Sequence, residues 1–280
     1  MKKLIAGLLL LIFLPLPSAQ ADTPVIRIVD KPHINFDGSF RNNDLATSLL
    51  PTGKLGKLVF TPPSSRETYV IDAALVDEIL LVAQNEEDSQ AKIAADNWLY
   101  RLKFATADNK IVALPYGNPD EKLLKRIAPG ELAYYSRYAQ VQLQKVLGRA
   151  VIAQSGWGKG SSRLSEEFIA DYTENRRLLT GLSTISTSPE IVELRARLGV
   201  VMNPLLNREE RTYFSFNKNK AVATMADKLR VVPGRYQITS ESTKLPITLI
   251  NNLETASVVS VSLIPMNSRC LLYTSDAADD

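Results

Sequence analysis

The sequence predicts an α/β protein organised around a parallel sheet. Three apolar runs end in polar residues, namely VIRIVD at 25–30, TYVID at 68–72 and KIVALPYGNPD at 110–120. Each precedes a segment with helical spacing, and a fourth short run at 150–153 leads into QSGWGKG. Because this repeat of strand, polar loop and helix is typical of crossover connections, we expect a parallel sheet whose loops gather at one edge.

Helices are predicted where apolar residues recur every three or four positions. Before residue 160 such segments begin at 42 or 43, 73, 91, 121 and 132. Pro51 and Gly53 end or interrupt the first of them. After residue 160 the pattern changes to helices without intervening strands, at 165–182, 189–201 and 209–229. The middle of the chain is therefore predicted to be a helical segment.

Three β-type runs follow Pro233: RYQITS, KLPITLINNL and ASVVSVSLIP. The alternation of Val259, Val261 and Leu263 is typical of sandwich strands. Three strands make a poor independent sandwich, which predicts a domain cut short on its C-terminal side. The last residues, 270–280, break the strand pattern, and we interpret them as a non-native tail. A genuine disordered terminus is the alternative.

The N-terminus has the pattern of a secretory signal peptide. Lys2 and Lys3 precede an apolar run at 4–14, and Ala19-Gln20-Ala21 forms a small-x-small cleavage site. A retained membrane anchor is the alternative, but the apolar run is about half of the ~20 residues that a span requires. No later stretch is long and apolar enough to cross a membrane. We therefore expect an exported protein, which Cys270, the one cysteine, cannot stabilise through an internal disulfide.

The residue inventory excludes several classes of chemistry. His33 is the one histidine of the chain, which argues against His-rich or Cys-type zinc sites, Ser-His-Asp hydrolases and metal-dependent polysaccharide deacetylases. Neither GxxxxGK[ST] nor GxGxxG occurs, so no nucleotide site and no cofactor is predicted. The formal charge of +3 is spread over 33 basic and 30 acidic residues, which gives nucleic-acid binding no support.

The candidate ligand-binding residues lie at the ends of the predicted strands, where parallel sheets usually bind ligands. They are Asp30, His33, Asp72, Tyr116, Asn118, Asp120 and Trp157. Carboxylates beside aromatic rings are typical of carbohydrate sites, and paired carboxylates can act as acid and nucleophile.

A purely structural interpretation of the same residues is also open. Asp72 can cap the next helix, and Asn118-Pro119-Asp120 can serve as a turn and helix start. Trp157 can cover the sheet, and His33 can satisfy a loop carbonyl. The two interpretations differ in whether the side chains meet in one cleft.

Several segments resemble a family of exported actinobacterial cell-envelope proteins of unknown function, often encoded beside the lipid II flippase. The matching segments are IVDKPH, YVIDAALVDE, AADNWL, ALPYGNPD, GRYQITSESTKLPITLINNL and VSVSLIPMNSR, within residues 25–269. The resemblance implies a partial or degenerate (β/α) barrel-like sheet, a helical middle segment and the first strands of an immunoglobulin-like β-sandwich. It also implies that a C-terminal membrane helix is missing and that the chain is truncated near Arg269.

The predicted organisation follows from these patterns and the resemblance together. It comprises a signal peptide at 1–21, an α/β barrel-like region at 22–160, a helical segment at 161–232, an incomplete sandwich at 233–269 and the tail at 270–280.

We expect a non-enzymatic scaffold or glycan-binding protein on the outer face of the cell membrane or in the cell wall. Its partners would be an envelope glycan or the cell-wall export machinery, and its contact with the membrane would be only through the missing helix. The alternative is a glycoside hydrolase or degenerate relative that uses Asp30, Asp72 and Asp120. No catalytic residue is assigned.

Overall fold

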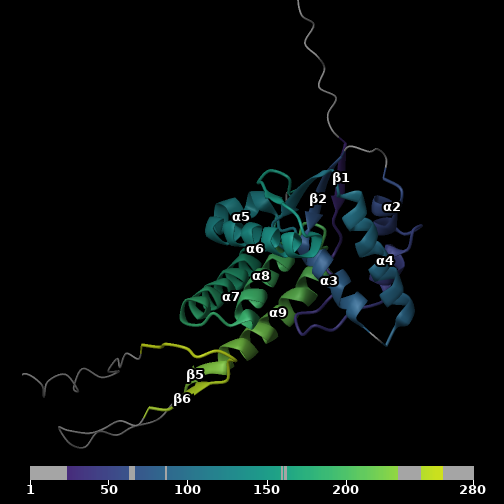
Figure 1. Cartoon of the computed structure of the whole chain (residues 1–280). Helices are drawn as coiled ribbons and strands as arrows, with labels where there is room; N and C mark the ends of the chain where they lie inside the picture. The colour runs from purple at the N-terminus through teal and green to yellow at the C-terminus, as the bar shows by residue number, and fades with distance from the viewer. Residues whose placement is uncertain are drawn as a thin grey trace, which may run out of the picture.

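The computed structural model describes residues 24–62, 67–85, 87–158, 160, 163–232 and 247–260 (Figure 1). The predicted signal peptide and the predicted tail at 270–280 lie outside the described residues. Most of the predicted sandwich at 233–269 does too, since 247–260 is the part of it that is described.

Four parallel strands form the central sheet: β1 (Val25–Ile28), β2 (Thr68–Asp72), β3 (Lys110–Leu114) and β4 (Ile152–Ala153). Their order in the sheet, β1-β2-β3-β4, is their order in the chain. Arg27, Val70 and Val112 align across the first three strands, and Val112 aligns with Ile152. The predicted parallel α/β sheet is thus confirmed, and within the described residues β1 and β4 are the edges of an open sheet.

Helices form in the predicted segments, including the helical middle of the chain. Their bounds are α1 (Asp44–Leu49), α2 (Lys54–Phe60), α3 (Ala73–Gln84), α4 (Ser89–Ala105), α5 (Glu121–Ile127), α6 (Pro129–Leu147), α7 (Glu166–Ile185), α8 (Pro189–Arg197), the 3-10 helix η1 (Leu198–Met202) and α9 (Arg208–Lys228). Side chains cap many of the starts, namely Asp72 for α3, Asp88 for α4, Asp120 for α5, Ser165 for α7 and Asn207 for α9.

The helix α2 has no counterpart among the predicted segments. It begins directly after Gly53, contains Gly56, and buries Leu55 and Val59 in the core. A Cβ at Gly56 would lie 1.8 Å from the carbonyl oxygen of Leu50, so glycine permits the close approach of α1 and α2. Gly53, which together with Pro51 indicated a break, is also a packing position, because a Cβ there would lie 2.4 Å from the carbonyl oxygen of Ser48.

Each face of the sheet packs against a different apolar cluster. Ile28, Ile71 and Ala113 point into the main core, which helices such as α3, α4 and α6 complete. On the opposite face, Val70, Val112 and Leu114 form a smaller cluster, against which Val29 and Trp157 pack. Trp157 in the segment after β4 thus helps to cover the second face.

The helices α7, α8 and α9 form a group beside α6, away from α2 and α4 (Figure 1). Arg195 of α8 donates to Glu131 of α6 at 2.6 and 3.1 Å. Lys218 of α9, whose side chain has 0% exposure, pairs with Asp171 of α7 at 2.5 Å. Charged pairs therefore link two helices of the helical segment, α7 and α9, to each other, and link α8 to α6, which packs on the sheet.

An antiparallel ribbon of β5 (Leu229–Val231) and β6 (Leu249–Asn251) follows α9 and lies at its far end (Figure 1). Strand β6 lies in the predicted sandwich at 233–269, whereas β5 lies at the end of the predicted helical segment at 161–232. None of the helices in the described ranges is long and apolar enough to span a membrane.

Candidate functional site

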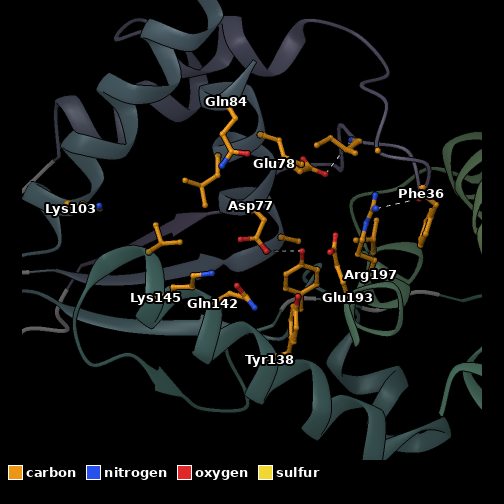
Figure 2. Close-up of a pocket in the computed structure, with 18 residues that line it drawn as sticks. Phe36, Asp77, Glu78, Gln84, Lys103, Tyr138, Gln142, Lys145, Glu193 and Arg197 are labelled. Carbon is orange, nitrogen blue, oxygen red and sulfur yellow. Dashed lines mark hydrogen bonds between the residues drawn. The ribbon is translucent and has the colours of Figure 1, made fainter. Parts of the chain in front are cut away.

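A pocket with a volume of about 780 Å³ lies between α3, α6, α8 and the loop after β1 (Figure 2). Its lining mixes carboxylates, amides, cations and tyrosines. The polar members are Asp77, Glu78, Gln84, Lys103, Tyr116, Tyr138, Gln142, Lys145, Glu193 and Arg197.

Asp77 is the carboxyl group at the centre of this pocket. It lies one turn inside α3, and its Oδ2 accepts a hydrogen bond from the Tyr116 hydroxyl at 2.9 Å. Burial raises the pKa of Asp77 to about 6, the Tyr116 hydrogen bond opposes the rise, and the charge of Glu193 adds to it. Asp77 can therefore exchange a proton near neutral pH.

Two tyrosine rings form the wall beside Asp77. The rings of Tyr116 and Tyr138 meet edge to face, with centroids 4.9 Å apart and planes at 82°. Burial raises the pKa of Tyr116 well above its usual value, so its hydroxyl stays a donor to Asp77. Tyr138 is half-buried and extends toward the pocket in Figure 2, which makes its ring an accessible apolar surface.

Glu78 and Asp72 hold the backbone around the pocket. Glu78 accepts hydrogen bonds from the N–H groups of His33 and Ile34, at 3.1 to 3.3 Å, and so fixes the loop after β1. Asp72 accepts from the N–H groups of Ala74 and Gly117, both at 3.0 Å. Burial raises the pKa of each carboxyl group to about 7, despite these hydrogen bonds.

Arg197 forms the end of the pocket next to Phe36. Its guanidinium lies 5.2 Å from the centroid of the Phe36 ring and donates to the carbonyl of Asn35 at 2.5 Å. Among the described residues, the ion pairs include neither Arg197 nor Lys145. In this part of the chain neither cation is therefore paired with a carboxylate, although backbone carbonyls hold Arg197 in place.

Of the predicted ligand-binding residues, Tyr116 lines this pocket. Asp30 instead pairs with Lys54 at 2.7 Å. Burial favours a higher pKa for Asp30, but the nearby His33 ring and the hydrogen bond from Lys54 outweigh it and hold the pKa at about 2. The His33 ring lies beside Asp30, with Nε2 and Oδ2 3.9 Å apart.

The remaining predicted residues have structural contacts. Asp72 and Asp120 are nearly fully buried and cap α3 and α5, as the structural interpretation of the sequence expects. Asn118 has φ 47° in the tight turn after β3. At the preceding Gly117, with φ 80°, a Cβ would lie 2.6 Å from the backbone nitrogen of Val200. Trp157 packs on the other face of the sheet.

Asp30 and Asp72 do share one crevice, beside Glu78 and Asn203. Its volume is about 10 Å³, which is room for about one water molecule. The predicted carboxylates are therefore not gathered in a cleft that could admit a sugar ring.

Most residues of the pocket were not predicted from the sequence, including Asp77, Glu193, Arg197 and Tyr138. One signal was present: the acidic pair Asp77-Glu78 interrupts an otherwise apolar helix in YVIDAALVDEILL. The α8 residues carry no such signal, since their helix has charged side chains throughout.

The described residues contain no group of three or more His, Cys, Asp or Glu side chains that could hold a metal ion. What the pocket offers is a proton-exchanging carboxyl group, unpaired cations, amides and a tyrosine surface. Comparisons with protein-family models, curated proteins and solved structures found no match to the chain.

Proposed function

We propose that the protein is a non-enzymatic glycan-binding protein or scaffold of the cell envelope, and that the pocket around Asp77 is its ligand site. The observation that carries this proposal is the combination of the Asp77–Tyr116 hydrogen bond with the accessible Tyr138 ring in one pocket of about 780 Å³. That volume lies within the range of about 300–1,000 Å³ typical of small-molecule sites.

The chemistry of the lining suits a sugar. A sugar ring presents hydroxyl groups at its rim and an apolar face, so it needs hydrogen-bonding groups around an aromatic surface. Asp77, Gln84 and Gln142 offer acceptors and donors, and Tyr138 offers the apolar surface (Figure 2). Arg197 and Lys145 can bind hydroxyl or acidic substituents.

The location and the finer fold belong to the same proposal. The signal-peptide pattern and the family resemblance support export to the outer face of the cell membrane or the cell wall. The consecutive order β1-β2-β3-β4 supports a partial (β/α) barrel, in which each strand pairs with the next. The alternating apolar pattern of the sequence after Pro233 supports an immunoglobulin-like sandwich. The cell-wall export machinery is the alternative partner to an envelope glycan.

Calorimetry of the mature chain with soluble peptidoglycan fragments tests glycan binding. Asp77→Asn and Tyr138→Ala are each expected to weaken binding at least about tenfold, because each removes a central contact. The matched controls are Asp96→Asn and Tyr100→Ala, at exposed positions of α4 outside the pocket, and these should bind normally. Equal effects of the pocket variants and the controls would contradict the proposal.

A glycoside hydrolase is the second candidate, and one observation favours it. Figure 2 shows Asp77 and Glu193 extending into the same pocket from α3 and α8, and the raised pKa of Asp77 suits a general acid. Release of reducing ends from peptidoglycan by the wild type, and its loss in both Asp77→Asn and Glu193→Gln, would establish this activity. If the wild type binds the glycan but releases no reducing ends, the hydrolase is excluded and the binding function is retained.

A further inference from the structure

A second pocket adjoins the first at the Phe36–Arg197 end. It lies between α8 and α9, has a volume of about 430 Å³, and shares Phe36, Glu193 and Arg197 with the first pocket. In Figure 2 Lys103 lies at the opposite end of the first pocket from Phe36. The two pockets therefore follow one another along a cleft rather than lying on separate faces.

The junction between the pockets is fixed in place. Phe36 is buried, and Arg197 donates to the carbonyls of Asn35 and Phe36 from a position over the Phe36 ring. Glu78 holds the same loop through the N–H groups of His33 and Ile34. A junction with this many constraints gives a ligand a preformed contact at the middle of the cleft.

The second pocket carries further polar groups along α9. Asn217, Lys220 and Thr224 line it, and Lys220 and Thr224 are exposed. An ion pair between Lys228 and Glu190 forms another part of its wall. These groups can hydrogen-bond to a second unit of a polar ligand, as the lining of the first pocket can to the first unit.

We propose that the ligand is a linear oligosaccharide that crosses Arg197 and occupies both pockets at once. This inference rests on the proposed glycan-binding function and adds that the site selects a chain over a single unit. Each pocket has the volume of a small-ligand site. A chain that spans both gains the second set of contacts without a second loss of translational freedom, so its affinity exceeds that for either unit.

The test is calorimetry of the mature chain with peptidoglycan glycan fragments from a disaccharide to an octasaccharide. We expect affinity to rise at least about tenfold along the series. Thr224→Trp fills the second pocket and should remove this rise with length. Thr212→Trp is the matched control, because both threonines are exposed on α9 and donate to the carbonyl four residues earlier at 3.0 Å.

The outcomes separate this inference from the function on which it rests. Disaccharide binding that does not strengthen with length, or a length effect that survives Thr224→Trp, would overturn the two-pocket ligand and leave glycan binding intact. Failure of every fragment to bind would overturn both. Circular dichroism and thermal melting of each variant establish that the substitution has not unfolded the chain.

Discussion

The carboxylate of Asp72 accepts the backbone N–H of Gly117 at 3.0 Å and thereby ties the end of β2 to the turn after β3. The same oxygen accepts from Ala74 at the start of α3. One buried side chain thus fixes a helix start and the turn that carries Tyr116 into the pocket. Its removal should affect stability and the geometry of the site together.

We expect Asp72→Ala to lower the free energy of unfolding by about 2–4 kcal/mol, because it removes a helix cap and leaves two buried N–H groups without an acceptor. Asp72→Asn keeps an oxygen at the same place and should cost less than half as much. Urea denaturation at neutral pH measures both. Equal losses in the two variants would show that the acceptor oxygen is not what stabilises this region.

The stability of the protein should fall as the pH rises through neutrality. Burial raises the pKa of Asp72 and Glu78 to about 7 and that of Asp77 to about 6. Because these folded-state values exceed the unfolded-state values of about 4, the groups stabilise the fold fully below pH ~4. That contribution is lost as the pH rises through about 6–7, since the folded state must then bury charges.

We therefore expect a free energy of unfolding that is on the order of 2 kcal/mol higher at pH 5 than at pH 8. The double substitution Asp72→Asn with Glu78→Gln should flatten most of this difference. Asp30→Asn is the control: the pKa of Asp30 is held at about 2, so its contribution is lost only as the pH falls below about 4. If the free energy of unfolding of the double variant depends on pH as that of the wild type does, groups other than Asp72 and Glu78 cause the dependence.

The loop after β4 should depend on Glu121. The Glu121 carboxylate accepts the N–H groups of Gly156 and Gly158 at 2.8 and 2.7 Å, on either side of Trp157. We expect Glu121→Ala to free this loop and to lower the free energy of unfolding by about 1–3 kcal/mol. Lys122→Ala, at an exposed neighbouring position, should do neither.

Acrylamide quenching of tryptophan fluorescence reports this change directly. Trp98 has 0% exposure and donates to the carbonyl of Leu55, so it should resist quenching in every variant. Trp157 is half-buried against the second face of the sheet and should become more accessible in Glu121→Ala. A quenching curve identical to that of the wild type would mean that the glutamate does not hold the loop.

The Lys218–Asp171 pair should respond asymmetrically to the loss of either partner. The Lys218 side chain has 0% exposure and that of Asp171 has 28%. Asp171→Ala leaves a buried ammonium group without a partner and should cost about 3 kcal/mol or more. Lys218→Met leaves a carboxylate that water can reach, and we expect a smaller cost, measured by urea denaturation. The reverse order would mean that Lys218 acts mainly through packing.

Local signals in the sequence predicted the elements of this fold. The strands begin and end close to where apolar runs meet polar residues, and Asp72 and Asp120 occupy the cap positions that one interpretation expected. Helix α2 was not predicted because Pro51 and Gly53 indicate the end or an interruption of the preceding helix, whereas the role of Gly56 depends on how closely Leu50 approaches. That approach is a tertiary property.

The pocket was not predicted from the sequence for a related reason. Asp77 and Tyr116 are separated by 39 positions, and Arg197 comes from a helix with no strand before it. Helical periodicity tells which residues share a face of one helix, but it does not tell which helices meet. The strand ends predicted Asp72 and Asp120 as ligand-binding residues, but in the fold these two residues cap helices. The carboxyl group that lines the pocket, Asp77, lies one turn inside α3.

The consecutive strand order also determines when each part of the molecule can form. Because β2 adds to β1, β3 to β2 and β4 to β3, every strand pairs with a segment that has already been synthesised. The sheet can therefore grow from the N-terminus as the chain is delivered, through pairings of modest sequence separation. The pocket cannot form at this stage, because Arg197, which forms one of its walls, follows the last of these strands in the chain. Ligand binding would therefore become possible only after the sheet has formed.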